Sequence, residues 1–467
     1  MESPPRPTVL LTALTVLATT AAAQTPLEQV ATDFELLGCS VTSFCGDNIQ
    51  QSFHWGTRQL EAGWAVTSTT QYRIASVSKA VVATACARLV ESGELAYDAP
   101  VDAWLGWPLV HPSHPEVPVT VGDLLSHRSG LQDGTGYSAF LGATYAAGPD
   151  APPIADLVLE TGSAFTSNMW HSNPPGSYFQ YANVNYGMLA TVLEAATGMR
   201  FDALMDSLVL HPLDIAGSFN LGTLPDLEEV ATLYRNQGGW TPQADDFLNN
   251  PPVAWDFSTY VPGTNGLVFA PQGGLRISTE ELARIAAVWE DGAWNGVSVL
   301  GAQGLAALHE SAWTTDGSNG NTYYGLFNSW SWGLHRANLH PGDAFFADQT
   351  LFIGHPGEAY GLISDLYLEP GTGWGFAFAT NGAWSGYSFG QTSWYAVEEA
   401  IHQALASDRN ACANGLRVPL VSAPSDDAVP AWFDLSGRLI SVQNASTEPG
   451  AFVRVDGGAA KSVRLSH

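Results

Sequence analysis

Strand-like segments flank a long helical region, and this order constrains the fold more than any other feature of the chain. Near the start, SVTSFC (40–45) and IQQSFHWGTRQL (49–60) have the pattern of a hairpin. Near the end, ISDLYLEP (363–370) and GFAFATNG (375–382) flank a Gly-rich turn. A sheet made from these segments takes its strands from both ends of one domain. We therefore expect an α/β fold, with helices flanking an antiparallel sheet and a helical subdomain inserted between the two strand pairs.

Apolar periodicity, glycine stops and capping residues predict the main helices. The Ser278 helix begins with a capping pattern completed by Glu281. The expected helices cover Leu27–Leu37, Ser76 to Gly93, Tyr186–Thr197, Ser278–Trp289 and Ser393–Leu405. From Asp408 onward there is no long helix, so residues 409–467 are expected to form a linker and a small C-terminal β appendage.

The charge balance argues against binding to nucleic acid. The chain has 467 residues, with 45 acidic and only 17 basic side chains, giving a formal charge of −28. Neutralising phosphates requires clustered Lys and Arg, and Lys79 and Lys461 are the only lysines. Apolar residues make up 45% of the chain, enough for a large core.

The N-terminal segment predicts export. Residues Pro7–Ala23 are apolar, and small side chains precede Gln24, which is typical of a signal peptide covering residues 1–23. An uncleaved anchor is the alternative. No other segment approaches the length of a membrane span. We expect a mature hydrolase domain from residue 24 to 408 that is secreted into the periplasm, to the cell surface or to the medium.

Four cysteines are compatible with an oxidising compartment. Cys39 and Cys45 lie at the two ends of one strand-like segment, too far apart to pair with each other. A disulfide would join Cys412 to Cys39 or to Cys45, whereas Cys86 is expected to be a buried thiol. No cysteine spacing suggests zinc, and His111 and His114 lie in a Pro-rich loop where metal ligation is not expected.

Ser76 and Lys79 open the first long helix in the pattern S-x-x-K. Residues three apart share a helix face, so the Lys79 ammonium can reach the Ser76 hydroxyl. The helix start also supplies a positive dipole end and a free N–H for a developing oxyanion. Ser76 is therefore a candidate nucleophile, and the alternative is a capping serine beside an exposed lysine.

Tyr181 and Asn183 form a Y-x-N pattern before the second long helix. A nearby ammonium lowers the pKa of a phenol, so Tyr181 is a candidate general base. The Asn183 amide can bind both Lys79 and a substrate carbonyl. Tyr234 begins a second match. It lacks the Pro-Gly segment that precedes the first pattern and the apolar helix that follows it.

A third pattern, His355-Pro-Gly357-Glu358, precedes the late strand pair. At a strand edge, Gly357 would let a substrate backbone approach closely. His340 begins a similar HPGD sequence in a less suitable context. A competing G-x-S-x-G match at Ser388 would need an acid and a histidine downstream on further strands, and no room remains for them.

In this order, the three patterns resemble the serine β-lactamase and penicillin-binding-protein superfamily. The likeness is greatest to the class C β-lactamase-like branch, which includes esterases and D-aminopeptidases. The segments RIASVSKA, LLSHRSGL, YANVNYGML, GGLRISTEELARI and FIGHPG occur in family order between Leu37 and Ala406. The resemblance implies a β-lactamase-like fold with the site in a cleft, and neither a metal nor an organic cofactor.

The resemblance also implies roles for individual residues. Ser76 would form the acyl-enzyme, and Lys79 and Tyr181 would transfer its proton and activate the deacylating water. Asn183 would hold Lys79 and the substrate amide. The N–H groups of Ser76 and Glu358 would form the oxyanion hole, as family position suggests. His127 and Arg128 in LLSHRSGL are expected to be structural.

The third pattern departs from the family's K-T-G in a way that concerns the substrate. His355 replaces the lysine and is only partly charged at neutral pH, and Pro356 supplies no hydroxyl for a β-lactam carboxylate. We therefore expect a secreted serine hydrolase acting on a small-molecule ester or small-peptide amide. The alternatives are a β-lactamase or D,D-carboxypeptidase, and a penicillin-binding or degenerate protein without turnover.

The C-terminal segments WFDLSGRLIS and PGAFVRVDGG resemble the sorting domains of type IX secretion. That resemblance implies a secretion-machinery partner for the tail. The alternative is a plain β appendage.

Overall fold

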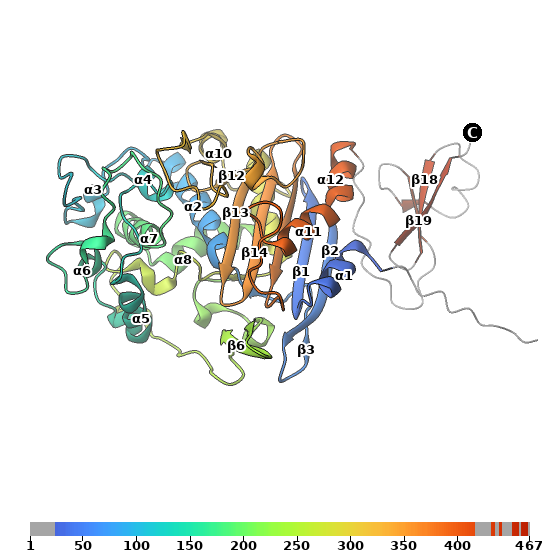
Figure 1. Ribbon diagram of the computed structural model, residues 1–467, viewed down its shortest axis with the longest axis horizontal. Helices are drawn as coiled ribbons and strands as arrows, with labels where there is room; N and C mark the ends of the chain where they lie inside the picture. The colour runs from blue at the N-terminus through green and yellow to red at the C-terminus, as the bar shows by residue number, and fades with distance from the viewer. Residues whose placement is uncertain (1–23, 416–430, 435–438, 441–450, 457–458, 466–467) are drawn as a thin grey trace, which may run out of the picture.

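The computed structural model describes residues 24–415, 431–434, 439–440, 451–456 and 459–465 (Figure 1). The predicted signal peptide lies outside the described residues. Parts of the predicted sorting sequence do too, but four described strands there form an antiparallel sheet in the order β17-β16-β18-β19. These strands are β16 (Ala431–Asp434), β17 (Leu439–Ile440), β18 (Ala451–Asp456) and β19 (Ala459–Leu465). The prediction that the tail contains β-structure is confirmed for these residues.

Within the described residues, an antiparallel sheet of nine strands confirms that strands from both chain ends meet. The N-terminal strand β1 pairs with the late strand β15 on one side and with β2 on the other. In spatial order the strands are β10 (Trp313–Thr314), β11 (Ser329–Trp330), β12 (His335–Ala337), β13 (Phe352–Ala359), β14 (Leu362–Glu369), β15 (Trp374–Thr380), β1 (Gly38–Cys45), β2 (Asn48–Gln59) and β3 (Trp64–Ala65).

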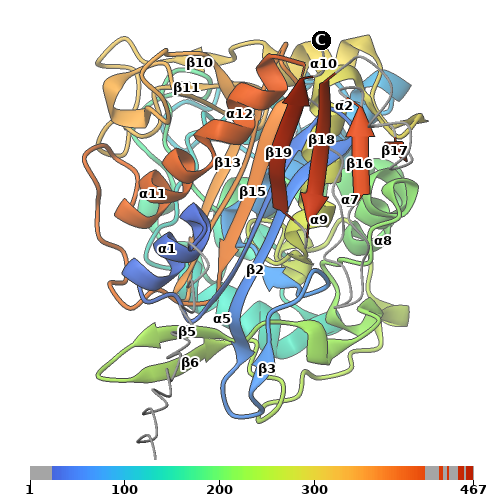
Figure 2. The same ribbon diagram turned by 90° about the vertical axis from the view of Figure 1, so that its right-hand side faces the viewer.

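Alternating side chains of the central strands bury both faces of this sheet. On β15, Phe376 and Phe378 pack beneath α1 (Pro26–Asp33) and α11 (Ala396–Ala404), whereas Ala377 and Ala379 join the core on the opposite side. The small alanines allow α9 (Thr279–Asp291) to lie against that side. Figure 2 shows α1, α11 and α12 (Ala406–Ala413) over the first face.

The remaining helices lie mainly on the side of the sheet away from α1, α11 and α12 (Figure 1). They are α2 (Ser78–Ser92), α3 (Asp102–Leu105), α4 (Val121–Leu125), α5 (Tyr137–Ala147), α6 (Ala155–Val158), α7 (Val184–Thr197), α8 (Phe201–Met205) and α10 (Ala302–His309). The predicted stops are confirmed, since Gly93 and Gly198 end α2 and α7 in the left-handed conformation. The predicted capping box of Ser278 and Glu281 is also confirmed.

Short strand pairs complete the inserted region. They are β4 (Tyr72–Arg73) with β7 (Arg276–Ile277), β5 (Leu233–Asn236) with β6 (Trp240–Ala244), and β8 (Ala293–Trp294) with β9 (Val297–Ser298). The first pair is central to the site, because β4 leads directly into the short 3-10 turn η1 (Ala75–Val77) and then into α2.

A disulfide ties the start of the sheet to its last helix. Cys45 at the end of β1 is bonded to Cys412 on α12, with their Cα atoms 5.7 Å apart. This is one of the two pairings expected from the sequence, and Cys86 is a buried free thiol as predicted. The expected domain end at residue 408 falls inside α12. The disulfide holds this helix to the sheet, and so does the ion pair between Arg409 and Glu369 on β14. All of α12 therefore packs with the domain.

Among the described residues, no helix combines the length and apolar character needed to cross a bilayer.

Candidate active site

The Ser76 hydroxyl and the Lys79 ammonium come together at the junction of η1 and α2. Lys79 Nζ lies 3.0 Å from Ser76 Oγ, as the helical spacing predicted. Lys79 is fully buried, whereas Ser76 is partly exposed and lines a pocket. The nucleophile candidate is therefore accessible, and the amine behind it is shielded from water.

Three oxygen atoms surround the Lys79 amine. In addition to Ser76 Oγ, Nζ donates to Asn183 Oδ1 at 2.9 Å and to the Gln272 carbonyl at 2.7 Å. Burial lowers the pKa of Lys79 to about 7, and the Asp133 carboxylate opposes this shift. A neutral amine can donate its two hydrogens to Asn183 and Gln272, which leaves its lone pair facing Ser76. This arrangement lets Lys79 accept the proton of Ser76.

Asn183 is held by a carboxylate that the sequence analysis missed. Asp133 Oδ2 accepts from the N–H and the Nδ2 of Asn183 at 3.0 and 2.9 Å, and Asp133 Oδ1 accepts from the N–H of Val184 at 2.9 Å. Asp133 thus satisfies the free N–H groups at the start of α7 and orients the Asn183 oxygen towards Lys79. It comes from a loop 50 residues earlier, so no local sequence signal identifies it.

Tyr181 lies where its hydroxyl reaches the nucleophile, but its electrostatics differ from the expectation. Lys79 Nζ is 5.0 Å from the centre of the Tyr181 ring. Burial raises the pKa of Tyr181 far above its usual value, and a hydrogen bond with Ser76 opposes this only in part. The predicted lowering of the pKa is wrong because desolvation outweighs the nearby amine. Tyr181 is a neutral phenol that can relay a proton.

His127, which the sequence analysis treated as structural, supports the Tyr181 ring. The ring centres of His127 and Tyr181 are 4.3 Å apart. His127 Nδ1 accepts from the Ala182 N–H at 3.2 Å, which places the ring proton on Nε2. Burial and the Lys79 charge keep the pKa of His127 well below its usual value. The LLSHRSGL motif was the sequence signal that could have identified this role. Its histidine packs against the Tyr181 ring.

His355 belongs to the same buried group. It lies on β13 with no exposed surface, and its ring centre is 5.9 Å from that of Tyr181. Its Nδ1 donates to the Pro356 carbonyl at 2.6 Å. Burial and the Lys79 charge hold the pKa of His355 well below its usual value. The expected partial charge at neutral pH is therefore wrong, and His355 is a neutral neighbour that does not line the pocket.

Gly357 has a different steric role from the one expected. A Cβ on Gly357 would lie 2.3 Å from Ser364 Oγ and 2.6 Å from the Ile74 carbonyl. The missing side chain thus allows β13 to approach η1, and with it Ser76, rather than leaving space for a substrate. Gly357 and the exposed Glu358 still line the pocket that contains Ser76.

This pocket has a volume of about 350 Å³ and follows the open edge of β13. The partner strand β12 pairs with β13 only as far as Gly354, so the following residues are unpaired on that side within the described structure. Pro356 occupies this edge, where a missing N–H is tolerated. The opposite wall is largely aromatic, with Tyr323, Tyr324, Phe327, Phe389, Trp394 and Tyr395.

The competing sequence matches have other contacts. The Tyr234 hydroxyl is buried and accepts from the Leu60 N–H. His340 accompanies Asp343 in a local cap. Ser388 is exposed and donates to the Ser385 carbonyl, with no histidine partner in the described residues.

The described residues contain no group of three or more His, Cys, Asp or Glu side chains suited to a metal.

Comparison with known proteins gives a consistent picture. A family model described as Beta-lactamase matches residues 42–398. Penicillin-binding protein 4 of Amycolatopsis lactamdurans is 26% identical over 375 residues, which cover 77% of this chain and 84% of that protein. Esterase EstB of Burkholderia gladioli is 38% identical over 165 residues, which cover 34% of this chain and 40% of the esterase.

Among solved structures, the D-amino acid amidase of Ochrobactrum anthropi has a similar fold. The TM-score is 0.58 at 19% identity, over 83% of this chain and 98% of the amidase. At this identity the likeness concerns the fold alone.

Proposed function

Because the chain belongs to the beta-lactamase family and is a serine hydrolase, we propose that it cleaves an ester or a small-peptide amide through an acyl-enzyme on Ser76. The observation that carries this proposal is the buried Lys79 amine, 3.0 Å from Ser76 Oγ, with its pKa lowered to about 7. Such an amine is a base at neutral pH, and a base in contact with a hydroxyl makes a nucleophile.

Acylation begins when Lys79 accepts the Ser76 proton and Ser76 Oγ attacks the substrate carbonyl carbon. The N–H groups of Ser76 and Glu358 stabilise the oxyanion, where one donor contributes about 3 kcal/mol to the barrier reduction. Tyr181 passes the proton from Lys79 to the leaving alcohol or amine as the carbonyl bond to it breaks. In the second half, water gives a proton through Tyr181 to Lys79 and attacks the acyl carbon. The bond from this carbon to Ser76 Oγ then breaks, Oγ takes the proton back from Lys79, and the acid is released.

The charges around the pocket favour substrates without a carboxylate. Its lining contains Glu358 and Glu398 but neither Lys nor Arg. Burial raises the pKa of Glu398 well above its usual value, which leaves Glu358 as the carboxylate at the pocket surface. Glu358 repels the carboxylate of a β-lactam or of a D-Ala-D-Ala peptide. The aromatic wall suits an apolar acyl or leaving group.

A substrate panel tests this preference. We expect p-nitrophenyl esters or D-alanyl p-nitroanilide to be hydrolysed with a higher kcat/KM than a chromogenic cephalosporin. A cephalosporin turned over fastest would favour the β-lactamase alternative and contradict the proposal.

The Ser76→Ala variant tests the nucleophile. It should lose labelling by a fluorophosphonate and lose hydrolysis by a factor of about 10⁴ or more, while circular dichroism and Tm stay unchanged. Retained activity would overturn the assignment of Ser76.

A protein without turnover would also be labelled, so the time course matters. Mass spectrometry of wild-type protein mixed with an ester substrate should show an acyl adduct that forms and then decays. An adduct that persists after the substrate is consumed would favour the penicillin-binding alternative.

The proposal includes export. The Cys45–Cys412 disulfide supports an oxidising compartment, consistent with the signal-like sequence at residues 1–23. We also propose that the C-terminal tail contacts secretion machinery. Expression of the full chain in a type IX-competent host, with and without residues 416–467, tests this idea, and equal release of both forms would contradict it.

A further inference from the structure

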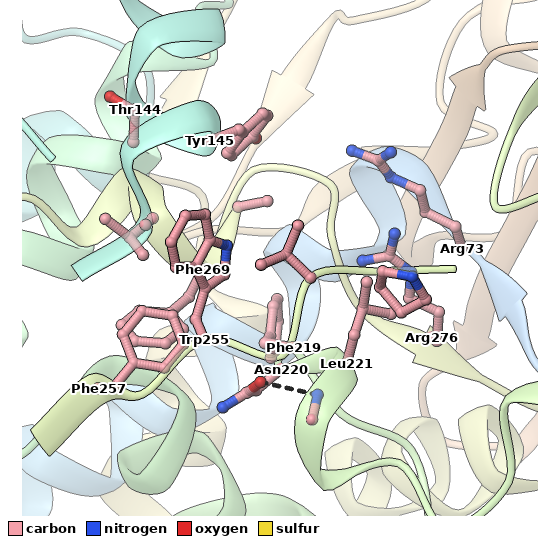
Figure 3. A pocket seen from close by; sticks show the side chains of 16 residues that line it. Arg73, Thr144, Tyr145, Phe219, Asn220, Leu221, Trp255, Phe257, Phe269 and Arg276 are labelled. Carbon is pink, nitrogen blue, oxygen red and sulfur yellow. Dashed lines mark hydrogen bonds between the residues drawn. The ribbon is translucent and has the colours of Figure 1, made fainter. Parts of the chain in front are cut away.

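A second cavity lies apart from the nucleophile pocket. It has a volume of about 280 Å³ and shares no lining residue with the pocket of Ser76. Its walls come from β4, the end of α5, the segments 219–222 and 252–257, and the segment 268–276 (Figure 3).

One wall of this cavity is aromatic. It consists of Phe219, Trp255, Phe257 and Phe269, and the ring centres of Phe257 and Phe269 are 5.0 Å apart. The indole of Trp255 is 40% exposed, and it lies so close to Gly148 that a Cβ there would be 2.4 Å from the ring. This large aromatic surface is positioned by close packing yet remains open to a ligand.

The opposite wall carries two arginines. Arg73 and Arg276 are directly opposite each other in the β4–β7 pair, an arrangement of like charges that costs stability unless a counter-charge is present. Asp245 contacts Arg276 directly, at 3.0 Å from Nε and 2.7 Å from Nη2, and its charge reaches Arg73 only from a greater distance. The Arg276 Nη1 donates to the Gly274 carbonyl, so each nitrogen of this guanidinium has an acceptor.

Arg73 has no carboxylate within ion-pair distance among the described residues. Its neighbours are the Gly273 carbonyl, 3.3 Å from Nε, and the Tyr360 ring, whose centre is 4.9 Å from Cζ. In Figure 3 its guanidinium points towards Tyr145 at the mouth of the aromatic wall. Within the described residues, the cavity therefore combines one guanidinium that lacks a directly bound carboxylate with a set of aromatic rings.

We propose that this cavity binds a small carboxylate with an aromatic or branched apolar body. The carboxylate would accept hydrogen bonds from Arg73, and the apolar body would lie against Trp255 and Phe269. A planar guanidinium suits a carboxylate in particular. The apolar wall favours such a molecule over inorganic anions or nucleotides.

Gln272 would connect the bound acid to Lys79, the amine next to Ser76. The segment that carries Ala270 and Arg276 also carries Gln272, whose carbonyl accepts from Lys79 and whose Nε2 donates to the Tyr145 hydroxyl at 3.1 Å. The cavity and the nucleophile thus share one supporting segment but remain separate sites.

Calorimetry with 4-phenylbutyrate on the full chain carrying Ser76→Ala tests the proposal independently of catalysis. We expect a single site with a Kd below about 1 mM. The neutral 4-phenylbutanol should bind at least about tenfold more weakly, because it lacks the charge-assisted bonds to Arg73. No heat of binding, or equal affinity for the alcohol, would overturn the proposal.

Variants locate the site. Arg73→Gln should weaken 4-phenylbutyrate by about tenfold or more, whereas Arg235→Gln, which changes an exposed arginine outside the cavity, should not. If Arg73→Gln does not fold, Trp255→Ala removes an exposed side chain and should weaken binding through the lost aromatic contact.

Wild-type protein labelled at Ser76 with a fluorophosphonate should still bind the acid. Loss of binding after labelling would place the acid in the nucleophile pocket and contradict the proposal.

Discussion

At the scale of single residues, the environment of Lys79 governs the chemistry of the site. Within the part of the chain that the structure describes, its amine has three oxygen neighbours and no carboxylate in direct contact, and burial lowers its pKa to about 7. The neutral form, which accepts the Ser76 proton in the proposed mechanism, predominates above this pKa.

The pH dependence of hydrolysis follows from this shift. With a neutral ester, kcat/KM should rise with pH up to about 7 and then level off. His127 and His355 should add no inflection near neutrality, because their pKa values are held well below the usual range. A rate that keeps rising to about pH 10 or above, with no plateau near 7, would indicate Tyr181 phenolate as the base and contradict this prediction.

The Asp133→Asn variant also tests whether Lys79 is the base, by removing a charge that opposes the lowering of its pKa. Asp133 raises the pKa of Lys79, so its removal should move the acid limb to lower pH. Because Asp133 is exposed, the shift should be small and should shrink further in high salt. Asp150→Asn, an exposed carboxylate on η2 (Gly148–Asp150), serves as the control and should leave the profile unchanged.

Glu358 provides a prediction about specificity. Replacing it by Gln keeps the backbone N–H and removes the charge, so kcat/KM for an anionic cephalosporin should rise about three- to tenfold. The value for a neutral ester should change little. Equal changes for both substrates would show that Glu358 does not discriminate by charge.

The residue contacts show where sequence reasoning succeeds. The contact between Ser76 and Lys79 follows from helix spacing, and the link to Asn183 was expected from the second pattern. Asp133 and the Gln272 carbonyl could not be predicted, because one acts across a long loop and the other through its backbone. The error about the pKa of Tyr181 arose because burial is not visible in a local motif.

At the scale of elements, the close packing of β13 against η1 positions Ser76, the proposed nucleophile. Long helices were predictable because their glycine stops and caps are local signals, as at Gly198 and Ser278. The two-residue strands β10 and β11 and the short helix α12 carry too little periodicity to be recognised, so tertiary contacts define them.

Gly357→Ala tests this packing. The added methyl group would collide with Ser364 Oγ and the Ile74 carbonyl, so β13 must move away from Ser76. We expect a loss of stability of about 1–3 kcal/mol and a larger proportional loss of kcat than of substrate affinity. Denaturant unfolding and steady-state kinetics measure the two effects.

Gly142→Ala is the matched control, since a Cβ there meets no atom within 4 Å on helix α5. It should stabilise the protein slightly and leave kcat unchanged. If Gly357→Ala behaves in the same way, the close packing of β13 does not position the nucleophile.

At the scale of the whole molecule, the Cys45–Cys412 disulfide joins segments 367 residues apart. A cross-link that closes such a long loop restricts the unfolded chain. The sequence left two partners open for Cys412, because both candidate cysteines lie on the same strand and only the folded position of α12 distinguishes them.

Cys412→Ser should therefore lower the free energy of unfolding by about 2–4 kcal/mol. Activity at 25 °C should persist, because neither cysteine lines the pocket of Ser76. A reducing agent should lower the Tm of the wild-type protein and leave that of the variant unchanged. An equal response of both proteins would contradict a stabilising role for this bond.

The placement of β1 between β15 and β2 also determines when the protein can become active during its synthesis. Strand β1 cannot pair with β15 until Thr380, which lies opposite Cys39 in the sheet, has left the ribosome. At roughly 5–20 residues per second, this delay is tens of seconds. The Ser76 turn emerges early, but β13 (Phe352–Ala359) and the late strands beside it are made more than 270 residues later. The growing polypeptide thus carries Ser76 in an unassembled state until these late strands have been made.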